Sequence, residues 1–503
     1  MNLGPLCFRA DASVAMGTGH VMRCLALAQA WQEAGGTAVY ALAQTNGAID
    51  ARLRSQHIKL ATIAATPGSA LDGQQLIETA RVHSCTWVVV DGYHFGAEYQ
   101  QALKSAGLKV LFVDDTGHAT HYCSELILNQ NAHASAEMYS SRDSGTRLLL
   151  GSRYAMLRRE FWSWSEFKRN VPSQGRKVLV TMGGSDPENL TLRVIEALAQ
   201  ANVDGLEAAI VVGGSNPHIE SLRRAAKDSA KKIRLLNDVP NMPELIAWAD
   251  VAVSAAGSTC WEMCFLGLPA ILVDVAPNQT PVAKELDRLG AAAHIGDAAS
   301  ASPEAIAARL KSLLDSQPAR LTMSRQASRL VDGRGAERVV AAIRNGSLRL
   351  RKVEEGDCRV LWEWANDPAV RRVSFSNEPI PWERHVEWFH AKLEDQNTLL
   401  YIALNGERVP VGHVRYDLNG SKAVMSINLA MAFRGKGYGG AIMELATDEV
   451  FRATETKAIH AFVKPDNQPS LKLFTNAGFG REATVAIRGQ QAVHFVLDRS
   501  RTT

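Results

Sequence analysis

The sequence predicts an α/β protein with two Rossmann-like domains followed by a smaller α+β domain. Three observations support this class. The 503 residues exceed one ordinary hydrophobic core. Short apolar runs alternate with amphipathic stretches through the first two thirds of the chain, and the last third mixes helix, alternating strand and a glycine-rich turn. Hydrophobic residues make up 46% and charged residues 21%, as in a globular protein.

The first domain is predicted over residues 1–165. Amphipathic spacing favours helices at 22–34 and 96–106. Short apolar runs predict buried strands at 6–8, 38–42, 87–90 and 110–113. The alternation of strand and helix indicates right-handed βαβ units and therefore a parallel sheet.

Two breaks in the pattern set the other boundaries. A charged and aromatic passage at 158–176 contains Pro172 and Gly175, so we place the second domain at 166–345, with strands at 178–181, 208–212, 251–254 and 270–273. An Arg-Asn-Gly-Ser sequence at 344–347 ends a helix before a new strand at Leu348, which places the third domain at 346–503. We expect the first two domains to face each other across a cleft.

Charge and cysteine content exclude several classes of protein. The 55 Lys and Arg against 52 Asp and Glu give a formal charge of +3, so no electrostatic case exists for nucleic-acid binding. The 7 cysteines are scattered without paired spacing, which indicates reduced thiols and no metal. No run approaches the roughly 20 apolar residues of a membrane span. We therefore expect a cytoplasmic protein without membrane attachment of its own, as a monomer or weak homodimer.

A histidine follows the first strand in a glycine-rich loop. The loop reads Arg9-x-Asp11-x-Ser13-x-x-x-Gly17-x-Gly19-His20-x-x-Arg23. Glycines permit close ligand approach, and a helix start favours an anion. A neutral imidazole there can accept a proton from water, so His20 is the candidate general base. The alternative is a histidine that caps the helix or bonds the backbone. Four other positions of the loop are candidate substrate contacts: Arg9, Gly17, Gly19 and Arg23.

This loop resembles a known family when it is taken with three later segments, Asp91-Gly92-Tyr93, Asp114-Asp115 and Asn129-x-Asn131. The family is the UDP-2,4-diacetamido-2,4,6-trideoxy-β-L-altropyranose hydrolase of pseudaminic acid biosynthesis. It is similar in turn to the GT-B glycosyltransferase that makes the lipid-linked peptidoglycan disaccharide. The resemblance covers the first two thirds of the chain. It implies a GT-B-like fold and metal-independent hydrolysis at the anomeric carbon, with inversion and release of UDP.

The same resemblance implies roles for individual residues. His20 matches the catalytic histidine of the family, and Asp11 would orient it or hold a sugar hydroxyl. Tyr93 is the third candidate catalytic residue. For Asp91 and Asp115, as for Tyr93, a structural role at a strand end is an equal alternative.

Glycine-rich turns in the second domain indicate where the nucleotide binds. Turns at 182–186, which include Gly183, and at 212–216 follow predicted strands. The segment 254–262 resembles the donor-binding motif of the same glycosyltransferases. That likeness implies that Gly257, Ser258 and Thr259 hold the pyrophosphate and Glu262 the ribose hydroxyls. The alternative is an ordinary capping box between Thr259 and Glu262. Asn278 is a weaker candidate for sugar contact.

The last third resembles the GNAT superfamily, in particular its sugar-amine and ribosomal-protein N-acetyltransferases. The early motif is Trp362-x-Trp364-x-Asn366-Asp367-Pro368. A strand at 424–429, a turn at 434–439 and a helix at 440–450 follow, and a second cofactor motif runs from Val463 to Phe479. The resemblance implies acetyl-CoA as co-substrate and no metal, with nine contacts: Leu429, Arg434, Gly435, Lys436, Gly437, Tyr438, Gly439, Asn467 and Ser470. The strand is expected to splay near Leu429 so that a backbone group can bond the thioester carbonyl.

Two catalytic groups of this domain are not fixed by the pattern. Phe474 stands where the family usually has a tyrosine that protonates the leaving thiolate, and phenylalanine has no proton to give. Water or another residue must serve. The base that collects the proton of the acceptor amine has three candidates: His385, Asn428 and Asp417. Trp382 and Trp388 are expected to pack the acceptor wall or the core.

The fusion indicates two successive steps of one pathway. We expect N-acetylation of a UDP-4-amino sugar, followed by hydrolysis of UDP-2,4-diacetamido-2,4,6-trideoxy-L-altrose to the free sugar and UDP. Two alternatives remain. The N-terminal part is a UDP-sugar glycosyltransferase, or it is a non-catalytic ligand-binding module on a protein N-acetyltransferase. Sugar stereochemistry, pseudaminic or legionaminic, is left open.

Overall fold

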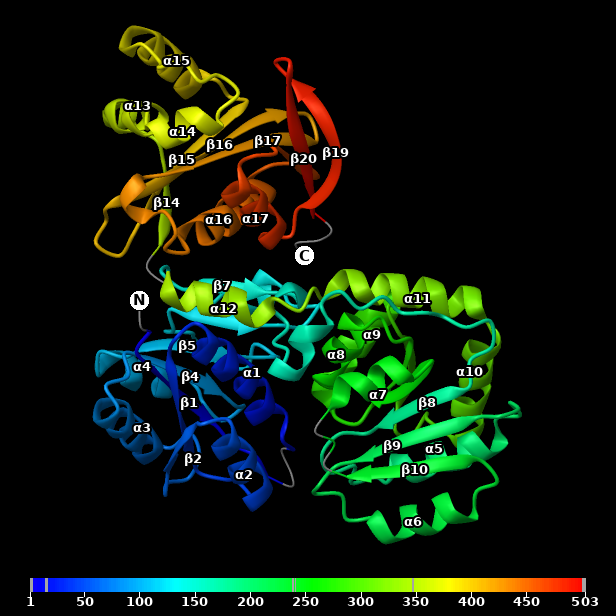
Figure 1. Cartoon of the computed structure of the whole chain (residues 1–503). Helices are drawn as coiled ribbons and strands as arrows, with labels where there is room; N and C mark the ends of the chain where they lie inside the picture. Colours follow the sequence, from blue (N-terminus) through cyan, green and yellow to red (C-terminus); the bar gives the residue numbers. More distant parts are fainter. Residues whose placement is uncertain (1–2, 14–16, 238, 240, 346–347, 500–503) are drawn as a thin grey trace. The chain divides into compact units, whose positions relative to one another are not determined.

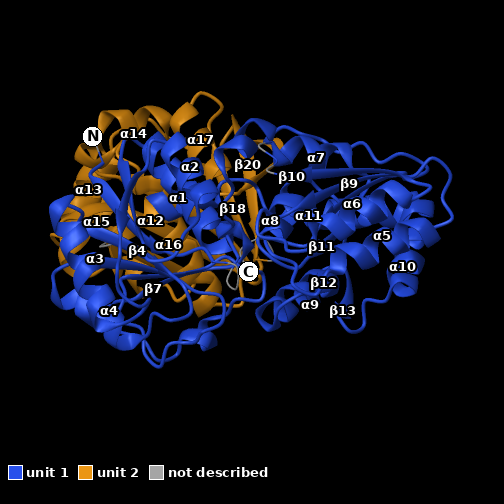
Figure 2. Ribbon diagram, turned by 90° about the horizontal axis from the view of Figure 1, so that it is seen from below, with its two compact units in different colours: residues 1–340 blue, residues 341–503 orange. Residues whose placement is uncertain are grey.

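The computed structural model describes residues 3–13, 17–237, 239, 241–345 and 348–499 (Figure 1). The chain divides into two compact units, Met1–Val340 and Ala341–Thr503 (Figure 2). The division falls inside helix α12 (Gly335–Arg344). Residues 346–347, where the third domain was predicted to begin, lie outside the described residues, as do residues 14–16 of the histidine loop.

The first sheet has seven parallel strands in the order β3-β2-β1-β4-β5-β6-β7. The predicted strands correspond to β1, β2, β4 and β5. Strands β3, β6 and β7 were not predicted, because four residues carry too little periodic signal. The elements are β1 (Pro5–Ala10), α1 (Gly19–Glu33), β2 (Thr37–Leu42), α2 (Gly47–Ser55), β3 (Lys59–Thr62), α3 (Ala70–Val82), β4 (Trp87–Asp91), α4 (Ala97–Ser105), β5 (Lys109–Val113), β6 (Leu126–Asn129) and β7 (Arg147–Leu150).

The second sheet has six parallel strands in the order β10-β9-β8-β11-β12-β13. The four predicted strands form its centre, whereas the edge strands β10 and β13 are partly exposed and lack a continuous apolar run. The elements are β8 (Lys177–Thr181), α5 (Leu190–Gln200), β9 (Glu207–Val212), α6 (Ile219–Asp228), β10 (Lys232–Asn237), α7 (Met242–Trp248), β11 (Val251–Ala255), α8 (Thr259–Phe265), β12 (Ala270–Asp274), α9 (Thr280–Arg288), β13 (Ala293–Asp297), α10 (Pro303–Asp315) and α11 (Gln317–Leu330).

The linker between these sheets is part of a hydrophobic core. Ala155, Leu157 and Phe161 are buried against the side of the second sheet that carries α7 and α8. The linker also contacts the first sheet's helices, since the Arg159 amide donates to the Gln29 side chain. The first boundary is therefore a packed segment that joins both sheets within one unit.

Unit 2 contains one mixed sheet in the order β14-β15-β16-β17-β18-β20-β19. Only β17 and β18 pair in parallel. Helices α16 and α17 cover one face, and α13 and α15 cover part of the other (Figure 1). The elements are β14 (Arg349–Lys352), α13 (Cys358–Ala365), α14 (Pro368–Val373), α15 (Trp382–Glu394), β15 (Thr398–Leu404), β16 (Pro410–Asn419), β17 (Lys422–Leu429), α16 (Tyr438–Ala453), β18 (Ala458–Val463), α17 (Gln468–Asn476), β19 (Gly480–Ile487) and β20 (Gln490–Asp498).

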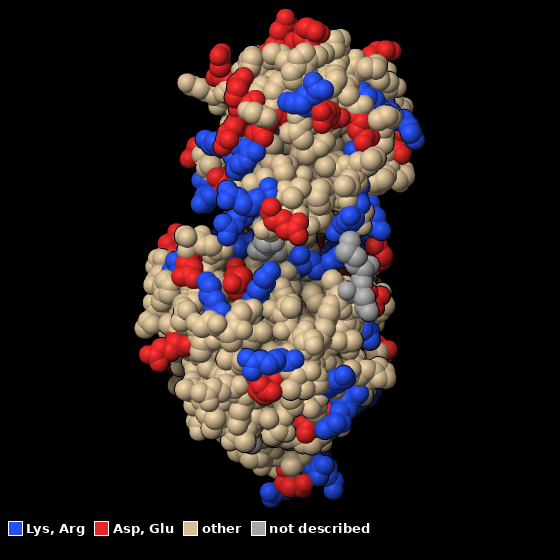
Figure 3. Space-filling model, turned by 90° about the vertical axis from the view of Figure 1, so that its left-hand side faces the viewer, with Lys and Arg blue, Asp and Glu red and all other residues tan. Residues whose placement is uncertain are grey.

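The three sheets confirm the predicted α/β class, with two parallel sheets followed by a mixed one. Basic and acidic side chains lie interspersed on the face in Figure 3, in keeping with a formal charge of only +3. Among the helices of the described ranges, none combines the length and the apolar character required to cross a bilayer.

Candidate functional site

His20 lies in the first turn of α1, after the loop that follows the carboxyl end of β1. The residue is 6% exposed, and its Nδ1 atom is 2.7 Å from Oδ1 of Asp91. Asp91 is the last residue of β4 and pairs in register with Ala10, the last residue of β1. Sheet order therefore brings together two residues that are 71 positions apart, at the strand ends where parallel sheets hold their ligands.

The contacts of Asp91 decide which ring nitrogen of His20 carries a proton. Arg23 donates Nε and Nη2 to the Asp91 carboxylate, both at 2.6 Å. Burial would raise the pKa of Asp91, but the charge of Arg23 and the hydrogen bonds from Arg23 and His20 outweigh it and hold the pKa well below its usual range. The ionised carboxylate only accepts hydrogen bonds, so Nδ1 of His20 donates and Nε2 keeps its lone pair. Nε2 has no hydrogen bond to any other described residue, and it can accept a proton.

A polar network continues from Arg23 to the second sheet. Arg23 Nη1 donates to both carboxylate oxygens of Asp115 at 2.8 Å, and Asn131 donates to the same group at 2.9 Å. The Tyr93 hydroxyl donates to Asp115 at 3.1 Å and accepts from Nδ2 of Asn278 at 2.8 Å. The Tyr93 ring also meets the His20 ring edge-on, with centroids 5.0 Å apart. The structure thus places Tyr93 and Arg23 beside His20, and Asn278 against the Tyr93 hydroxyl.

Arg9 and Asp11 are not where a substrate contact requires them. Arg9 is fully buried and donates Nε and Nη2 to Asp72 at 3.0 and 2.8 Å, while its Nη1 pairs with Asp11 at 2.8 Å. The other hydrogen bonds of Asp11 come from the amides of Ala43 and Gln44. The structure corrects two expectations: Arg9 is enclosed in a buried ion-pair cluster, and Asp91 instead of Asp11 orients His20.

Glycine turns from the two sheets meet beside the histidine loop. Gly17 has φ +72° and closes the loop through its amide to the Ser13 carbonyl, and Gly19 begins α1. A Cβ on Gly184 would lie 3.7 Å from the Thr18 nitrogen. Gly183, with φ +84°, precedes it in the turn after β8. These turns bring backbone from both sheets close to the start of α1.

The predicted nucleotide segment lies between β11 and α8. Ser258 precedes α8, and no side chain caps this helix start. The capping box between Thr259 and Glu262, which was the alternative to nucleotide binding, is therefore not formed at this helix start. Glu262 instead accepts from Arg158 at 2.8 Å, and its side chain is 13% exposed. A substrate hydroxyl would have to share the Glu262 carboxylate with Arg158 or displace Arg158 from it. A Cβ on Gly257 would lie 3.8 Å from the side-chain amide nitrogen of Gln279, which is an ordinary van der Waals distance.

In unit 2, strands β17 and β18 separate toward one end. They pair in parallel only from Lys422–Val424 to Ala458–His460. Beyond that point β17 stays paired with β16 as far as Leu429, and β18 with β20 as far as Val463. The separation near Leu429 has the form that the sequence predicted.

The glycine turn after β17 leads into an uncapped helix start. Gly435 and Gly437 have φ of +70° and +86°, and α16 begins at Tyr438, two residues before the predicted helix. The first amides of a helix have no intrahelical acceptor, so this turn presents free donors to a ligand. Lys436 lies over the Phe433 ring. Gly439 packs against leucine side chains on the inner side.

Three other residues predicted for the cofactor or its chemistry make structural contacts. Asn467 caps α17 by accepting from the Ser470 amide at 3.2 Å. Phe474 is 4% exposed and stacks on Phe495, which places the ring in the core.

The three predicted bases are already bonded within the protein. His385 is 2% exposed and its Nε2 meets the Cys358 carbonyl at 3.1 Å. Asn428 donates to the Trp364 carbonyl, and Asp417 pairs with Lys392. The sequence pattern missed His413, which stacks on the Trp364 ring and lies opposite Asn428. Burial, with Arg415 and His385, lowers the pKa of His413 to about 4, so its ring is neutral at pH 7.

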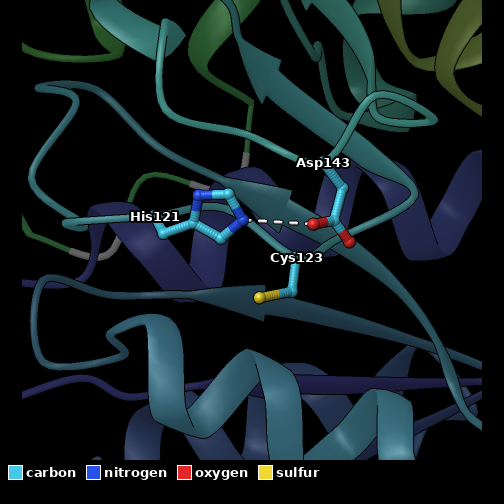
Figure 4. Close-up of side chains that lie close together, drawn as sticks. All are labelled: His121, Cys123 and Asp143. Carbon is cyan, nitrogen blue, oxygen red and sulfur yellow. Dashed lines mark hydrogen bonds and ion pairs between the residues drawn. The ribbon is translucent and has the colours of Figure 1, made fainter.

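One group of potential metal-ligand side chains in the described ranges contains none of the residues discussed above. His121, Cys123 and Asp143 lie with their ligand atoms within 4.8 Å of one another (Figure 4). Lys104 donates to Asp143 at 2.6 Å, and His121 contacts the same carboxylate at 3.1 Å. Lys104 therefore supplies the positive charge that balances Asp143 in this cluster.

Comparisons with known proteins agree with the two-part architecture. The family model described as "Glycosyltransferase family 28 C-terminal domain" matches residues 178–339, and "Acetyltransferase (GNAT) domain" matches 347–480. An uncharacterized protein, MJ1062 of Methanocaldococcus jannaschii, is 22% identical over 93% of this chain and 95% of its own length. The UDP-2,4-diacetamido-2,4,6-trideoxy-beta-L-altropyranose hydrolase of Campylobacter jejuni is 26% identical over 56% of this chain and 96% of its own.

Among solved structures, a spermidine N-acetyltransferase from Vibrio cholerae in complex with CoA and spermine is 21% identical. It covers 31% of this chain and 99% of its own, with a TM-score of 0.29. The sequence matches show that the chain fuses a region related to family 28 glycosyltransferases and to the altropyranose hydrolase with a GNAT acetyltransferase domain.

Proposed function

We propose that the chain catalyses two steps on one nucleotide sugar. Unit 2 transfers an acetyl group from acetyl-CoA to the amine of a UDP-4-amino sugar. Unit 1 hydrolyses UDP-2,4-diacetamido-2,4,6-trideoxy-L-altrose to the free sugar and UDP. The similarity to the Campylobacter jejuni hydrolase and the GNAT match support this pairing. The contact between His20 and Asp91 carries the hydrolytic part of the proposal.

His20 acts as the general base for water. Nε2 takes a proton as the water oxygen bonds to the anomeric carbon, and the bond from that carbon to the diphosphate breaks with UDP taking the electron pair. The imidazolium that forms is stabilised by Asp91, which stays ionised and holds Nδ1. Arg23 fixes Asp91 and links it to Asp115, so the base keeps one orientation throughout the reaction.

The second sheet supplies the nucleotide site. The turn with Gly183 follows β8, and the segment with Gly257, Ser258 and Thr259 follows the neighbouring strand β11. The first of these turns meets the histidine loop at Gly184. Backbone amides there suit a diphosphate. Asn278 reaches the Tyr93 hydroxyl from this sheet, so it is well placed to contact the sugar. Glu262 binds the ribose hydroxyls only when Arg158 releases the Glu262 carboxylate.

Unit 2 holds the coenzyme between its glycine turn and the separated strands. Acetyl-CoA supplies the activated acetyl group. The amides that open α16 face the pyrophosphate, and Lys436 adds positive charge. Asn467 and Ser470 contribute by fixing the start of α17. With Phe474 in the core, water protonates the leaving thiolate.

The test is a mass-spectrometric assay of the full chain. Incubation with a UDP-4-amino-4,6-dideoxy sugar and acetyl-CoA should add one acetyl group, and the acetylated product should release UDP without any sugar acceptor. His20→Ala should abolish UDP release and leave acetylation at the wild-type rate. His83→Ala, at the partly exposed end of α3 in the same unit, is the matched control. Equal UDP release by wild type and His20→Ala would refute the hydrolytic mechanism.

The match to glycosyltransferase family 28 favours a second candidate, a transferase that passes the sugar to a saccharide or lipid. The assay without acceptor separates the two, since a transferase releases UDP only when acceptor is added. A non-catalytic N-terminal module predicts no UDP release under either condition.

A further inference from the structure

Asp367 joins two parts of the acetyltransferase unit through Arg434. Its Oδ1 accepts from the Ala369 and Val370 amides at 2.8 and 3.3 Å and so caps α14. The same oxygen meets Nη1 of Arg434 at 3.2 Å, and the two side chains are 15% and 29% exposed. Asp367, a member of the early motif of the domain, therefore has a contact beyond its helix cap.

Arg434 carries this link to the end of β17. Its Nε donates to the Leu429 carbonyl at 3.0 Å. Leu429 is the last residue of β17, in the part of the strand that has separated from β18. One guanidinium thus binds both the strand end where the thioester is proposed to lie and the capped start of α14. Nε and Nη1 of Arg434, a residue expected to bind phosphate, make these two protein contacts, and its Nη2 has no partner among the described residues.

The motif around Asp367 also fixes the segment that follows α14. Asn366 accepts from the Ile380 amide at 2.7 Å and donates to the Ile380 carbonyl at 3.1 Å. Trp362 Nε1 donates to the same carbonyl at 2.8 Å. Earlier in the segment, the Phe375 carbonyl accepts from Gln490 at the start of β20. Residues 366–380 therefore form a braced strap on the face of the sheet opposite α16 and α17.

We propose that Asp367 is a positioning residue for acetyl transfer, which holds this strap against the thioester end of β17 through Arg434. The inference rests on the proposed acetyltransferase function. Through Arg434 the strap meets the separated end of β17, so an amine held beside the strap would meet the thioester there. The ion pair between Asp367 and Arg434 sets the distance between the amine and the thioester. Its loss would therefore lower the rate of acetyl transfer to the amine more than it weakens binding of the coenzyme.

Asp367→Asn separates the ion pair from the helix cap. Asparagine caps a helix as well as aspartate does, so α14 is retained while the charge is lost. The expected result is a fall of about 5- to 10-fold in kcat/KM for the UDP-4-amino sugar, in the range of a partly exposed ion pair that also aligns reactants. The Kd for CoA, measured by calorimetry, should stay within about twofold of wild type.

Asp357 provides a matched control, because it has the same two contacts elsewhere in the unit. It accepts from the Glu354 amide as part of a capping box and pairs with Arg351 at 2.6 Å. Asp357→Asn should lose similar stability and keep kcat/KM. In addition, the double variant Asp367→Asn with Arg434→Gln should have a kcat/KM no lower than that of Arg434→Gln alone. Both changes break the same ion pair, so their effects should not add.

Three results would overturn the inference: wild-type kcat/KM in Asp367→Asn, an equal loss in Asp357→Asn, or a parallel loss of CoA affinity. Failure of the proposed function looks different. In that case the wild-type chain itself would neither bind CoA nor acetylate the UDP-4-amino sugar, and the inference would fall with it.

Discussion

Nδ1 of His20 donates to Oδ1 of Asp91 across 2.7 Å, and Arg23 binds the same carboxylate with two nitrogens. The Asp91 carboxylate has two roles in this arrangement. It selects the His20 tautomer that leaves Nε2 free, and it balances a buried guanidinium. A change at Asp91 should therefore affect catalysis and stability together.

Asp91→Asn should slow UDP release by about 10²- to 10⁴-fold, the range expected when a histidine base loses its orienting carboxylate. The amide can present an N–H to Nδ1 and thereby favour the wrong tautomer. The rate of UDP release by the full chain measures the effect, with circular dichroism to check folding. Asp143→Asn, on the surface of the same unit, should keep the wild-type rate. A loss below threefold would show that another group orients His20.

The stability of the chain should depend on Asp91 in acid. Its folded-state pKa lies below the unfolded value of about 3.9, so its contribution is complete above that pH and is lost as the pH falls toward the folded-state pKa. Urea unfolding between pH 6 and 2 should show a decreasing free energy of unfolding below about pH 4. Asp91→Asn should be less stable at pH 6 and show a flatter decrease. Parallel curves for the two proteins would contradict this account.

Tyr93 and Asn278 should be energetically coupled in hydrolysis, because the Asn278 side-chain amide donates a 2.8 Å hydrogen bond to the Tyr93 hydroxyl. A double-mutant cycle with Tyr93→Phe and Asn278→Ala tests this on kcat/KM for the UDP-sugar. The expected coupling is about 0.5–1.5 kcal/mol, that of one hydrogen bond. Strictly additive effects would mean that the contact has no role in the reaction.

Gly437→Ala should weaken CoA binding because its φ of +86° is unfavourable for a residue with a Cβ. We expect a loss of about 1–2 kcal/mol, measured as the Kd for CoA by calorimetry. Gly420→Ala is the matched control. It has φ +57° in the turn between β16 and β17 with open space around its Cβ position, so it bears a similar backbone penalty outside the coenzyme turn. Equal CoA affinity in the two variants would argue against the proposed phosphate site.

Arg9→Met should destabilise the chain by about 3–5 kcal/mol, because it leaves the buried carboxylates of Asp72 and Asp11 without their partner. The measurement is urea unfolding at pH 7. Arg52→Met removes a partly exposed pair with Glu160 and should lose less than about 1 kcal/mol. If Arg9→Met instead kept full stability and raised KM for the UDP-sugar, the sequence-based assignment of Arg9 to substrate binding would stand.

Much of the fold was readable from local pattern. Central strands such as β4 and β12 are buried on both faces and appear as unbroken apolar runs. Edge strands such as β10 alternate in exposure and gave no such signal. The glycine turn before α16 was also predictable, because positive φ at Gly435 and Gly437 is a property of the residue type.

The site was predicted less completely, since pairing between distant charges has no local signature. Asp11 and Asp91 both follow a buried strand, and nothing in the sequence distinguishes the one that meets His20. The same is true of Arg9 and Arg23. Both are arginines in the histidine loop, yet Arg9 points into the cluster with Asp72 and Arg23 binds Asp91 and Asp115.

Local sequence was enough to predict two parallel-sheet regions followed by a mixed α+β region, the position of His20 at a helix start and the glycine turns, because hydrophobic period and glycine conformation act over a few residues. The assembled fold was needed to establish which carboxylate orients His20, that Asn278 reaches Tyr93, and that Arg434 ties Leu429 to Asp367. Those contacts depend on the order in which strands assemble into a sheet, and that order is set by the packing of the whole unit.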